Sequence, residues 1–144
     1  MFIDSHCHLN FSELSANLDE MLRNMRQNNV DRALCVSVNQ PDFPQVQALA
    51  EQHENIYASV GVHPDYEVDG EPTQEWLTQA AQHPKVVAIG ETGLDYYRLK
   101  GDLEWQRERF RVHIRAAREC DKPLIIHTRE AIGDTLRIMR EEGA

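Results

Sequence analysis

The sequence has few cationic residues, few cysteines and no long apolar segment, and each shortage argues against a class of protein. Its 15 Lys and Arg against 24 Asp and Glu give a formal net charge of −9. That charge argues against a protein that holds nucleic acid on a broad basic surface. A nuclease remains compatible, because bound metal ions can supply positive charge locally. No apolar run approaches membrane-spanning length and no signal-peptide pattern opens the chain, so we expect a cytoplasmic protein.

Cysteine is represented only by Cys7, Cys35 and Cys120, and no two of them form a C-x-x-C pair. An odd number of unpaired cysteines indicates free thiols in a reducing compartment rather than a disulfide framework. The remaining composition, 41% hydrophobic and 27% charged residues, is ordinary for a folded protein. We interpret Cys7 as a packed thiol rather than a metal ligand.

Short apolar runs alternate regularly with segments of helical periodicity. The expected strands are Met1–Ser5, Arg32–Val38, Ile56–Val62, Val86–Gly90 and Leu124–His127. Each strand is followed by apolar residues at helical spacing, and the expected helices run through Leu14–Met25, from Pro41 to Ala50, around Trp76, through Leu103–Ala117 and through Ile132–Met139. Near-continuous apolar strands alternating with amphipathic helices predict parallel βαβ units with both sheet faces covered.

Five such units in 144 residues are too few for a closed eight-stranded barrel. The pattern is compatible with an open five-stranded sheet of the flavodoxin-like type. It is equally compatible with a (β/α)8 barrel of the TIM type in which about five of the eight βα units are present. On the second interpretation, residues 1–144 are the N-terminal part of a single barrel domain truncated at its C-terminus.

Ligand-type side chains gather where the expected strands end, which is the edge at which parallel α/β folds build their sites. These side chains are, in chain order, Asp4, His6, His8, His63, Glu91 and His127. His6 and His8 carry the strongest signal, because residues two apart in an extended segment project to the same face. Two imidazoles on one side make half of a divalent-metal site. The alternative is a pair of partly exposed surface histidines.

Glu91 follows an apolar strand and precedes Thr92-Gly93-Leu94-Asp95, which we interpret as a Gly-flanked turn. A carboxylate there is often a loop charge, but on the same edge as three histidines we assign it a metal or catalytic role. His127 ends an otherwise apolar strand. In isolation it would be a core histidine, and in register with the other ligands it is a metal-ligand candidate.

Other candidates have weaker support. His63 is a possible substrate contact or metal-site neighbour, and a turn-stabilising role is about as good an explanation. Arg129 and Arg98 are possible phosphate contacts, because a guanidinium matches phosphate bidentately. Tyr96 and Tyr97 could stack on bases or pack under the loop. We assign no role to the remaining histidines, which are His53, His83 and His113.

Four motifs together resemble the TatD family of metal-dependent deoxyribonucleases, which belongs to the amidohydrolase-type barrel enzymes. The motifs occur in order at Asp4–Leu9 (DSHCHL), Gly61–Pro64 (GVHP), Ala88–Tyr97 (AIGETGLDYY) and Ile125–Ala131 (IIHTREA). The resemblance implies a (β/α)8 barrel with two divalent metal ions, and thereby favours the barrel over the open sheet.

By the family pattern, His6 and His8 would bind one ion, Glu91 would bridge both, and His127 would bind the second. Histidines with carboxylates suit Zn²⁺, Mn²⁺ or Ni²⁺, and Mg²⁺ is compatible with phosphoryl chemistry. The family's later His-Cys-Phe and Glu-Thr-Asp segments, which supply a further His and an Asp, have no counterpart here. Because the Asp is the best candidate for a proton acceptor, we assign no general base.

The implied function is phosphodiester hydrolysis with DNA as substrate. One alternative is an amide, lactone or small-phosphoester hydrolase on the same barrel, since fold does not fix substrate. The other is an inactive truncated fragment. We expect the isolated 144-residue chain to be aggregation-prone or partly folded and to hydrolyse DNA negligibly, because its two outer strands would have unpaired edges.

Overall fold

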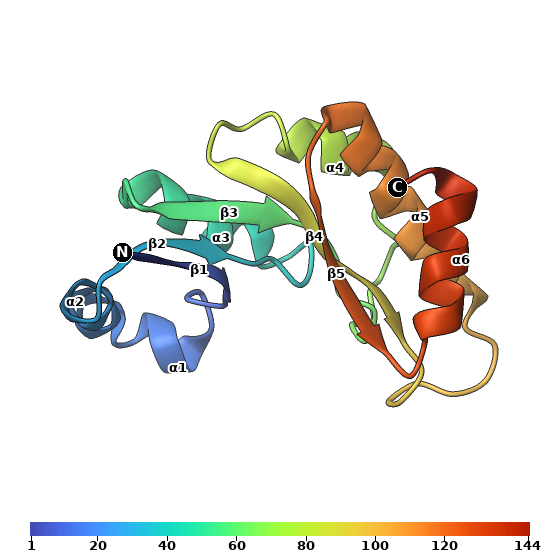
Figure 1. Cartoon of the computed structure of the whole chain (residues 1–144), viewed down its shortest axis with the longest axis horizontal. Helices are drawn as coiled ribbons and strands as arrows, with labels where there is room; N and C mark the ends of the chain where they lie inside the picture. Colours follow the sequence, from blue (N-terminus) through green and yellow to red (C-terminus); the bar gives the residue numbers. More distant parts are fainter.

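The computed structural model describes all residues 1–144 and contains one parallel sheet in the strand order β1-β2-β3-β4-β5 (Figure 1). Every strand pairs with its neighbour in the sequence, and the sheet curls from β1 near the N-terminus to β5 near the C-terminus (Figure 1). The strands are β1 (Phe2–Cys7), β2 (Val30–Cys35), β3 (Ile56–Val60), β4 (Val86–Asp95) and β5 (Leu124–Arg129). This sequential parallel order is that of a partly built barrel and excludes the flavodoxin-like order.

Six helices connect and flank the strands. They are α1 (Ser12–Ser15), α2 (Leu18–Gln27), α3 (Phe43–Gln52), α4 (Gln74–Ala80), α5 (Glu104–Cys120) and α6 (Ile132–Glu142). The single helix expected through Leu14–Met25 is wrong, because the chain leaves the helical conformation at Asn17 (φ −126°, ψ 30°) between α1 and α2. The helix expected from Pro41 begins two residues later, at Phe43, with a proline in its first turn.

The interpretation of residues 92–95 as a turn is also wrong, because β4 continues through them to Asp95. Gly90 and Gly93 adopt φ values of +138° and +135°, which residues other than glycine rarely adopt. These glycines accompany a register irregularity between Ile89 and Thr92, after which pairing with β5 resumes at Thr92–Ile126 and Gly93–His127. Glu91 therefore lies within a paired strand rather than in a loop.

Two apolar clusters hold the helices on the sheet. The larger joins β2, β3 and β4 to the inner faces of α2, α3, α4 and α5, with fully buried Val46, Ile56 and Leu77 among its members. The smaller packs Leu94 of β4 against Phe110 and other residues of α5 and α6. Each fully buried side chain of this size contributes about 1.5–3 kcal/mol, so the sheet is a firm base for groups at the strand ends.

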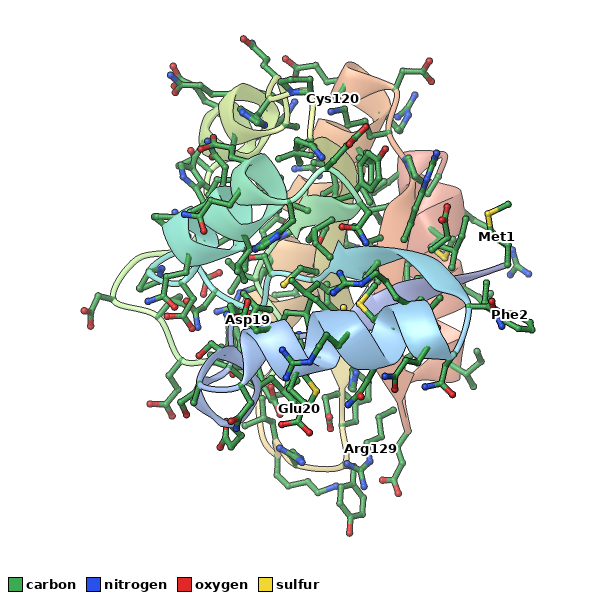
Figure 2. The ribbon with its side chains drawn as sticks, turned by 90° about the vertical axis from the view of Figure 1, so that its left-hand side faces the viewer. Met1, Phe2, Asp19, Glu20, Cys120 and Arg129 are labelled. Atoms are coloured by element: carbon green, nitrogen blue, oxygen red, sulfur yellow. The ribbon has the colours of Figure 1, made fainter.

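The strand β1 is the least covered part of the sheet. Phe2 and Ile3 are each 66% exposed, and the side chains of Met1 and Phe2 project from the body of the molecule (Figure 2). Only one of its edges is paired, with β2. No helix in the structure combines the length and the apolar character that crossing a bilayer requires.

Candidate metal centre

Four strands bring five ligand-type side chains together, from the end of β1, from just after β3 and from within β4 and β5. They form two groups whose ligand atoms lie within 4.8 Å of one another, and the groups are His6, His8 and Glu91, and His63, Glu91 and His127. Glu91 is common to both groups. All four residues expected to bind metal lie in this cluster, and so does His63, which we had considered as a substrate contact.

His6 and His8 come from the end of β1. Nε2 of His6 lies 3.1 Å from Oε2 of Glu91. Nδ1 of His8 lies 2.9 Å from the carbonyl oxygen of Val36. A carbonyl only accepts hydrogen bonds, so Nδ1 donates and Nε2 of His8 keeps its lone pair. The His8 ring also stacks on Phe11, with ring centroids 4.8 Å apart, which fixes its orientation further.

Glu91 is only 8% exposed, and its two carboxylate oxygens face different histidines. Oε2 faces His6, whereas Oε1 lies 3.7 Å from Nε2 of His63 and 3.4 Å from Nδ1 of His127. The strand β4 carries this carboxylate beyond the end of β3, since the last residue of β3, Val60, pairs with Ile89.

His63 and His127 each direct one ring nitrogen inward, toward Glu91 and toward the other ring. Nε2 of His63 lies 3.1 Å from Nδ1 of His127. The outward nitrogen of each ring meets a carboxylate: Nδ1 of His63 contacts Asp65, and Nε2 of His127 lies 3.0 Å from Oδ2 of Asp95. The Asp65 carboxylate is nearer to Nδ1 than the Asp65 backbone N–H, which is 3.3 Å away, so Nδ1 donates to the carboxylate. Burial lowers the pKa of His63, and attraction to Asp65 and Glu91 offsets this only in part.

The chemistry of this second group fits a cation. With their hydrogens directed outward, His63 and His127 present lone pairs to each other and to the acceptor oxygen Oε1 of Glu91. Three acceptors that converge without a donor repel one another unless positive charge lies between them. Imidazole nitrogens with a carboxylate are also ordinary ligands of Zn²⁺ and Mn²⁺.

Two carboxylates of the centre were not identified from the sequence as site residues. Asp65 contacts both His63 and Arg98, with Nη1 of Arg98 3.0 Å from Oδ2. Asp95 is 1% exposed. Burial would raise the pKa of Asp95, but hydrogen bonds from the Arg98 N–H, His127 and the Tyr97 N–H outweigh it and hold that pKa below its usual value. If the strand is predicted to continue through residue 95, Asp95 becomes a candidate site residue, because residues 91 and 95 then lie on the same face of the sheet.

The loop after β3, which carries His63, is held from behind by α5. The backbone N–H of Val62 donates to Nε2 of the fully buried His113 at 3.0 Å. Arg109 is 3% exposed, donates to the carbonyl oxygens of His63 and Tyr66 at 2.9 Å, and pairs with both carboxylate oxygens of Glu71. Thus His113, for which the sequence indicates no role, supports the position of the loop.

A shallow pocket over the cluster is bordered by His8, Phe11, Tyr66, Arg98 and Arg129. Arg98 is neutralised by Asp65, whereas no carboxylate lies within ion-pair distance of Arg129. The Arg129 guanidinium instead stacks on the exposed Tyr97 ring, 3.8 Å from its centroid, at one end of the molecule (Figure 2). Arg129 is therefore the available cationic side chain at the rim of the pocket.

Tyr96, which precedes Tyr97 in the sequence, has a different role. Tyr96 packs against the smaller apolar cluster, and its hydroxyl donates to Asp134 at 2.6 Å and accepts from Arg107 at 3.1 Å. Of the two explanations that the sequence left open for the tyrosine pair, packing under the loop holds for Tyr96.

Known proteins resemble this chain in sequence and in fold. The family model described as TatD related DNase matches residues 3–144. The chain belongs to this family. Among curated proteins, it is 37% identical over 145 residues to YabD of Bacillus subtilis (strain 168), and 38% identical over 143 residues to YcfH of Escherichia coli (strain K12). Both relatives are named uncharacterized metal-dependent hydrolases.

The matches to these two relatives cover 100% and 97% of this chain but 57% and 54% of the relatives. The chain thus spans about half the length of the curated relatives it matches. The crystal structure of YjjV, a TatD homologue from Escherichia coli K12, superposes with a TM-score of 0.88 at 32% identity, covering 98% of this chain and 56% of YjjV. The expected family and the barrel-type fold are confirmed.

Proposed function

We propose that this chain forms the catalytic half of a divalent-metal-dependent hydrolase that cleaves phosphodiester bonds in DNA. We propose also that residues 1–144 are the first five βα units of one (β/α)8 domain. The single observation that carries the proposal is the pair of ligand groups that share Glu91. The family description and the names of the relatives support the same chemistry.

In this proposal His6, His8 and Glu91 would hold one ion, and Glu91 and His127 would hold a second. His63 lies against the second position and is a candidate additional ligand. When bound as a close pair, divalent ions polarise a phosphoryl group, lower the pKa of water to ~7 and neutralise the leaving oxygen. Mg²⁺, Mn²⁺ and Zn²⁺ are the candidate ions.

The side chains of the chain itself would hold the two ions and orient the phosphate group. His8 is fixed by Val36 and Phe11, and Glu91 supplies the negative charge that keeps two cations close. Arg129 would contact a phosphate at the pocket rim; its position in the pocket lining and the lack of a carboxylate within ion-pair distance support this role. A chain of net charge −9 has no broad basic surface for a polyanion, so this local cationic contact and the bound ions would provide the attraction.

The test is a substrate panel on the natural protein, stripped of metal with a chelator and then reloaded with Mg²⁺, Mn²⁺ or Zn²⁺. We expect metal-dependent release of nucleotides from DNA, and little turnover of lactones, amides or carboxylic esters. Turnover of those small compounds without DNA cleavage would overturn the DNA assignment and favour another hydrolase on the same barrel. Full activity after chelation would overturn the metal assignment.

A further inference from the structure

The buried carboxylate of Asp95 lies outside both ligand groups and yet contacts one of their members. We propose that Asp95 is a positioning residue that fixes the tautomer of His127, so that Nδ1 rather than Nε2 is presented to a cation. The inference rests on the proposed function in one respect only, namely that a cation binds at His127.

The hydrogen bond between the two side chains determines the tautomer. Oδ2 of Asp95 lies 3.0 Å from Nε2 of His127. A carboxylate is an acceptor, so the ring hydrogen resides on Nε2 and the lone pair on Nδ1. That lone pair faces Oε1 of Glu91 at 3.4 Å and Nε2 of His63 at 3.1 Å, which is the second ligand group.

The carboxylate itself is held in place by backbone donors. Its other oxygen, Oδ1, accepts hydrogen bonds from the N–H groups of Tyr97 at 3.0 Å and Arg98 at 2.9 Å. Gln106 accepts from the Asp95 N–H at 2.9 Å. The N–H groups of Tyr97 and Arg98 thus hold one oxygen of the Asp95 carboxylate, which keeps the other oxygen turned toward His127.

Two other histidines of the centre, His8 and His63, follow the same principle with the opposite nitrogen. Nδ1 of His8 is held by the Val36 carbonyl and Nδ1 of His63 by Asp65, which leaves Nε2 free on both rings. His127 arrives from β5 with the reverse orientation, so its outward nitrogen is Nε2. Acceptors that orient metal-binding histidines in this way set the affinity of the site, and their loss typically lowers it 10–100-fold.

The decisive variant is Asp95→Asn in the natural protein. The new amide oxygen can still accept from the Tyr97 and Arg98 N–H groups, so the loop keeps its anchor. The amide nitrogen then faces Nε2 of His127 as a donor, which forces Nε2 to accept and moves the ring hydrogen to Nδ1. Asp134→Asn is the matched control. Asp134 lies in α6 and accepts a hydrogen bond from Tyr96, the residue after Asp95, but it does not contact His127.

Two measurements read out the effect without any activity assay. Nitrogen-15 NMR of the metal-free protein at alkaline pH should show His127 protonated at Nε2 in the wild type and in the control, and at Nδ1 in Asp95→Asn. Calorimetric titration with Mn²⁺ should show affinity reduced about 10–100-fold at one of two sites in Asp95→Asn, with the other site retained.

A wild-type His127 protonated at Nδ1 would overturn the proposal, and this reading holds even if the variant fails to fold. Unchanged tautomer and affinity in a folded Asp95→Asn protein would overturn it too, and would leave Asp95 a loop anchor only. If the tautomer and affinity behave as expected but DNA is not cleaved by the wild type, the positioning role stands and the proposed function fails.

Discussion

At the scale of single residues, Glu91 is distinguished by having a different set of histidines at each oxygen. A Glu91→Gln substitution keeps the size of the side chain, but it replaces one acceptor oxygen with an amide donor and removes the charge shared by both ligand groups. We expect the fold to persist and metal-dependent DNA hydrolysis to fall by at least ~10²-fold, because the two cations lose their common counter-charge. Hydrolysis rates at saturating Mn²⁺ measure the effect.

The control for this substitution is His53→Ala. The ring of His53 makes no hydrogen bond or ion pair in the structure, so stability should change by no more than about 0.5 kcal/mol and activity should be unaffected. Wild-type activity in the Glu91→Gln protein would remove Glu91 from the site.

His113 provides a prediction about pH. Burial lowers its pKa from 6.5 to about 4, against a partial opposing effect of its hydrogen bond to Arg109. Between these values the unfolded chain binds a proton at this ring and the folded chain does not. The free energy of unfolding should therefore fall as pH decreases from 6.5 to about 4, by roughly 3 kcal/mol from this residue.

Denaturant titrations across this pH range, on the wild type and on His113→Gln, isolate the contribution. The variant should be less stable at neutral pH and should lose less stability on acidification. Parallel curves for the two proteins would show that His113 is protonated in the folded state as readily as in the unfolded one.

The sequence identified His6, His8, Glu91 and His127 as ligand candidates because each belongs to a short motif at a strand end. Their assignment as metal ligands remains a prediction, although the structure brings them together. The sequence did not identify Asp95 and His113 as functional residues, because their roles depend on contacts with partners 32 and 51 positions away. Pairings over such separations follow from how the helix α5 and the strand β5 pack. A local pattern points to Asp95 only if the strand is extended through residue 95, and none points to His113.

At the scale of elements, β4 shows where local patterns fail. Glycine-rich sequence is typical of turns, and on that basis the strand was expected to end at Gly90. The glycines instead let the backbone of β4 approach that of β5, since a Cβ on Gly93 would overlap the carbonyl oxygen of His127. Close approach of two backbones is the other reason for a glycine in a strand, and sequence alone does not distinguish the two.

Gly93→Ala should therefore destabilise the protein by more than ~2 kcal/mol, because strain at φ +135° adds to the overlap with β5. It should also weaken metal binding by shifting His127. Gly133→Ala, in α6 with nothing near the added methyl group, should be neutral or stabilising by up to about 1 kcal/mol. Thermal melts with and without Mn²⁺ compare the pair, and equal melting temperatures would contradict the close-approach argument.

At the scale of the whole molecule, the alternation of apolar strands and amphipathic helices was enough to predict the parallel sheet, and the motifs were enough to predict its barrel type. Both predictions are confirmed. Exact strand bounds were not predictable, because apolar runs do not mark where pairing stops. The sequence predicts one helix too few, because the break at Asn17 does not interrupt the spacing of apolar residues through Leu14–Met25.

The poorly covered strand β1 leads to a prediction about the isolated 144-residue chain. Exposed Ile3 and Phe2 lie beside an unpaired strand edge, which is a template for association with other chains. We expect this chain to form concentration-dependent oligomers in size-exclusion chromatography with light scattering. Ile3→Lys should reduce them, whereas Gln79→Lys, which adds the same charge on α4, should not. A monomeric wild-type chain at high concentration would refute this expectation.

Anomalous diffraction from crystals of the natural protein grown with Mn²⁺ would show whether a two-cation centre is built around Glu91. We predict two peaks about 3.5–4 Å apart, one between His6, His8 and Glu91 and the other between Glu91 and His127. A single peak away from Glu91, or none at these side chains, would contradict it.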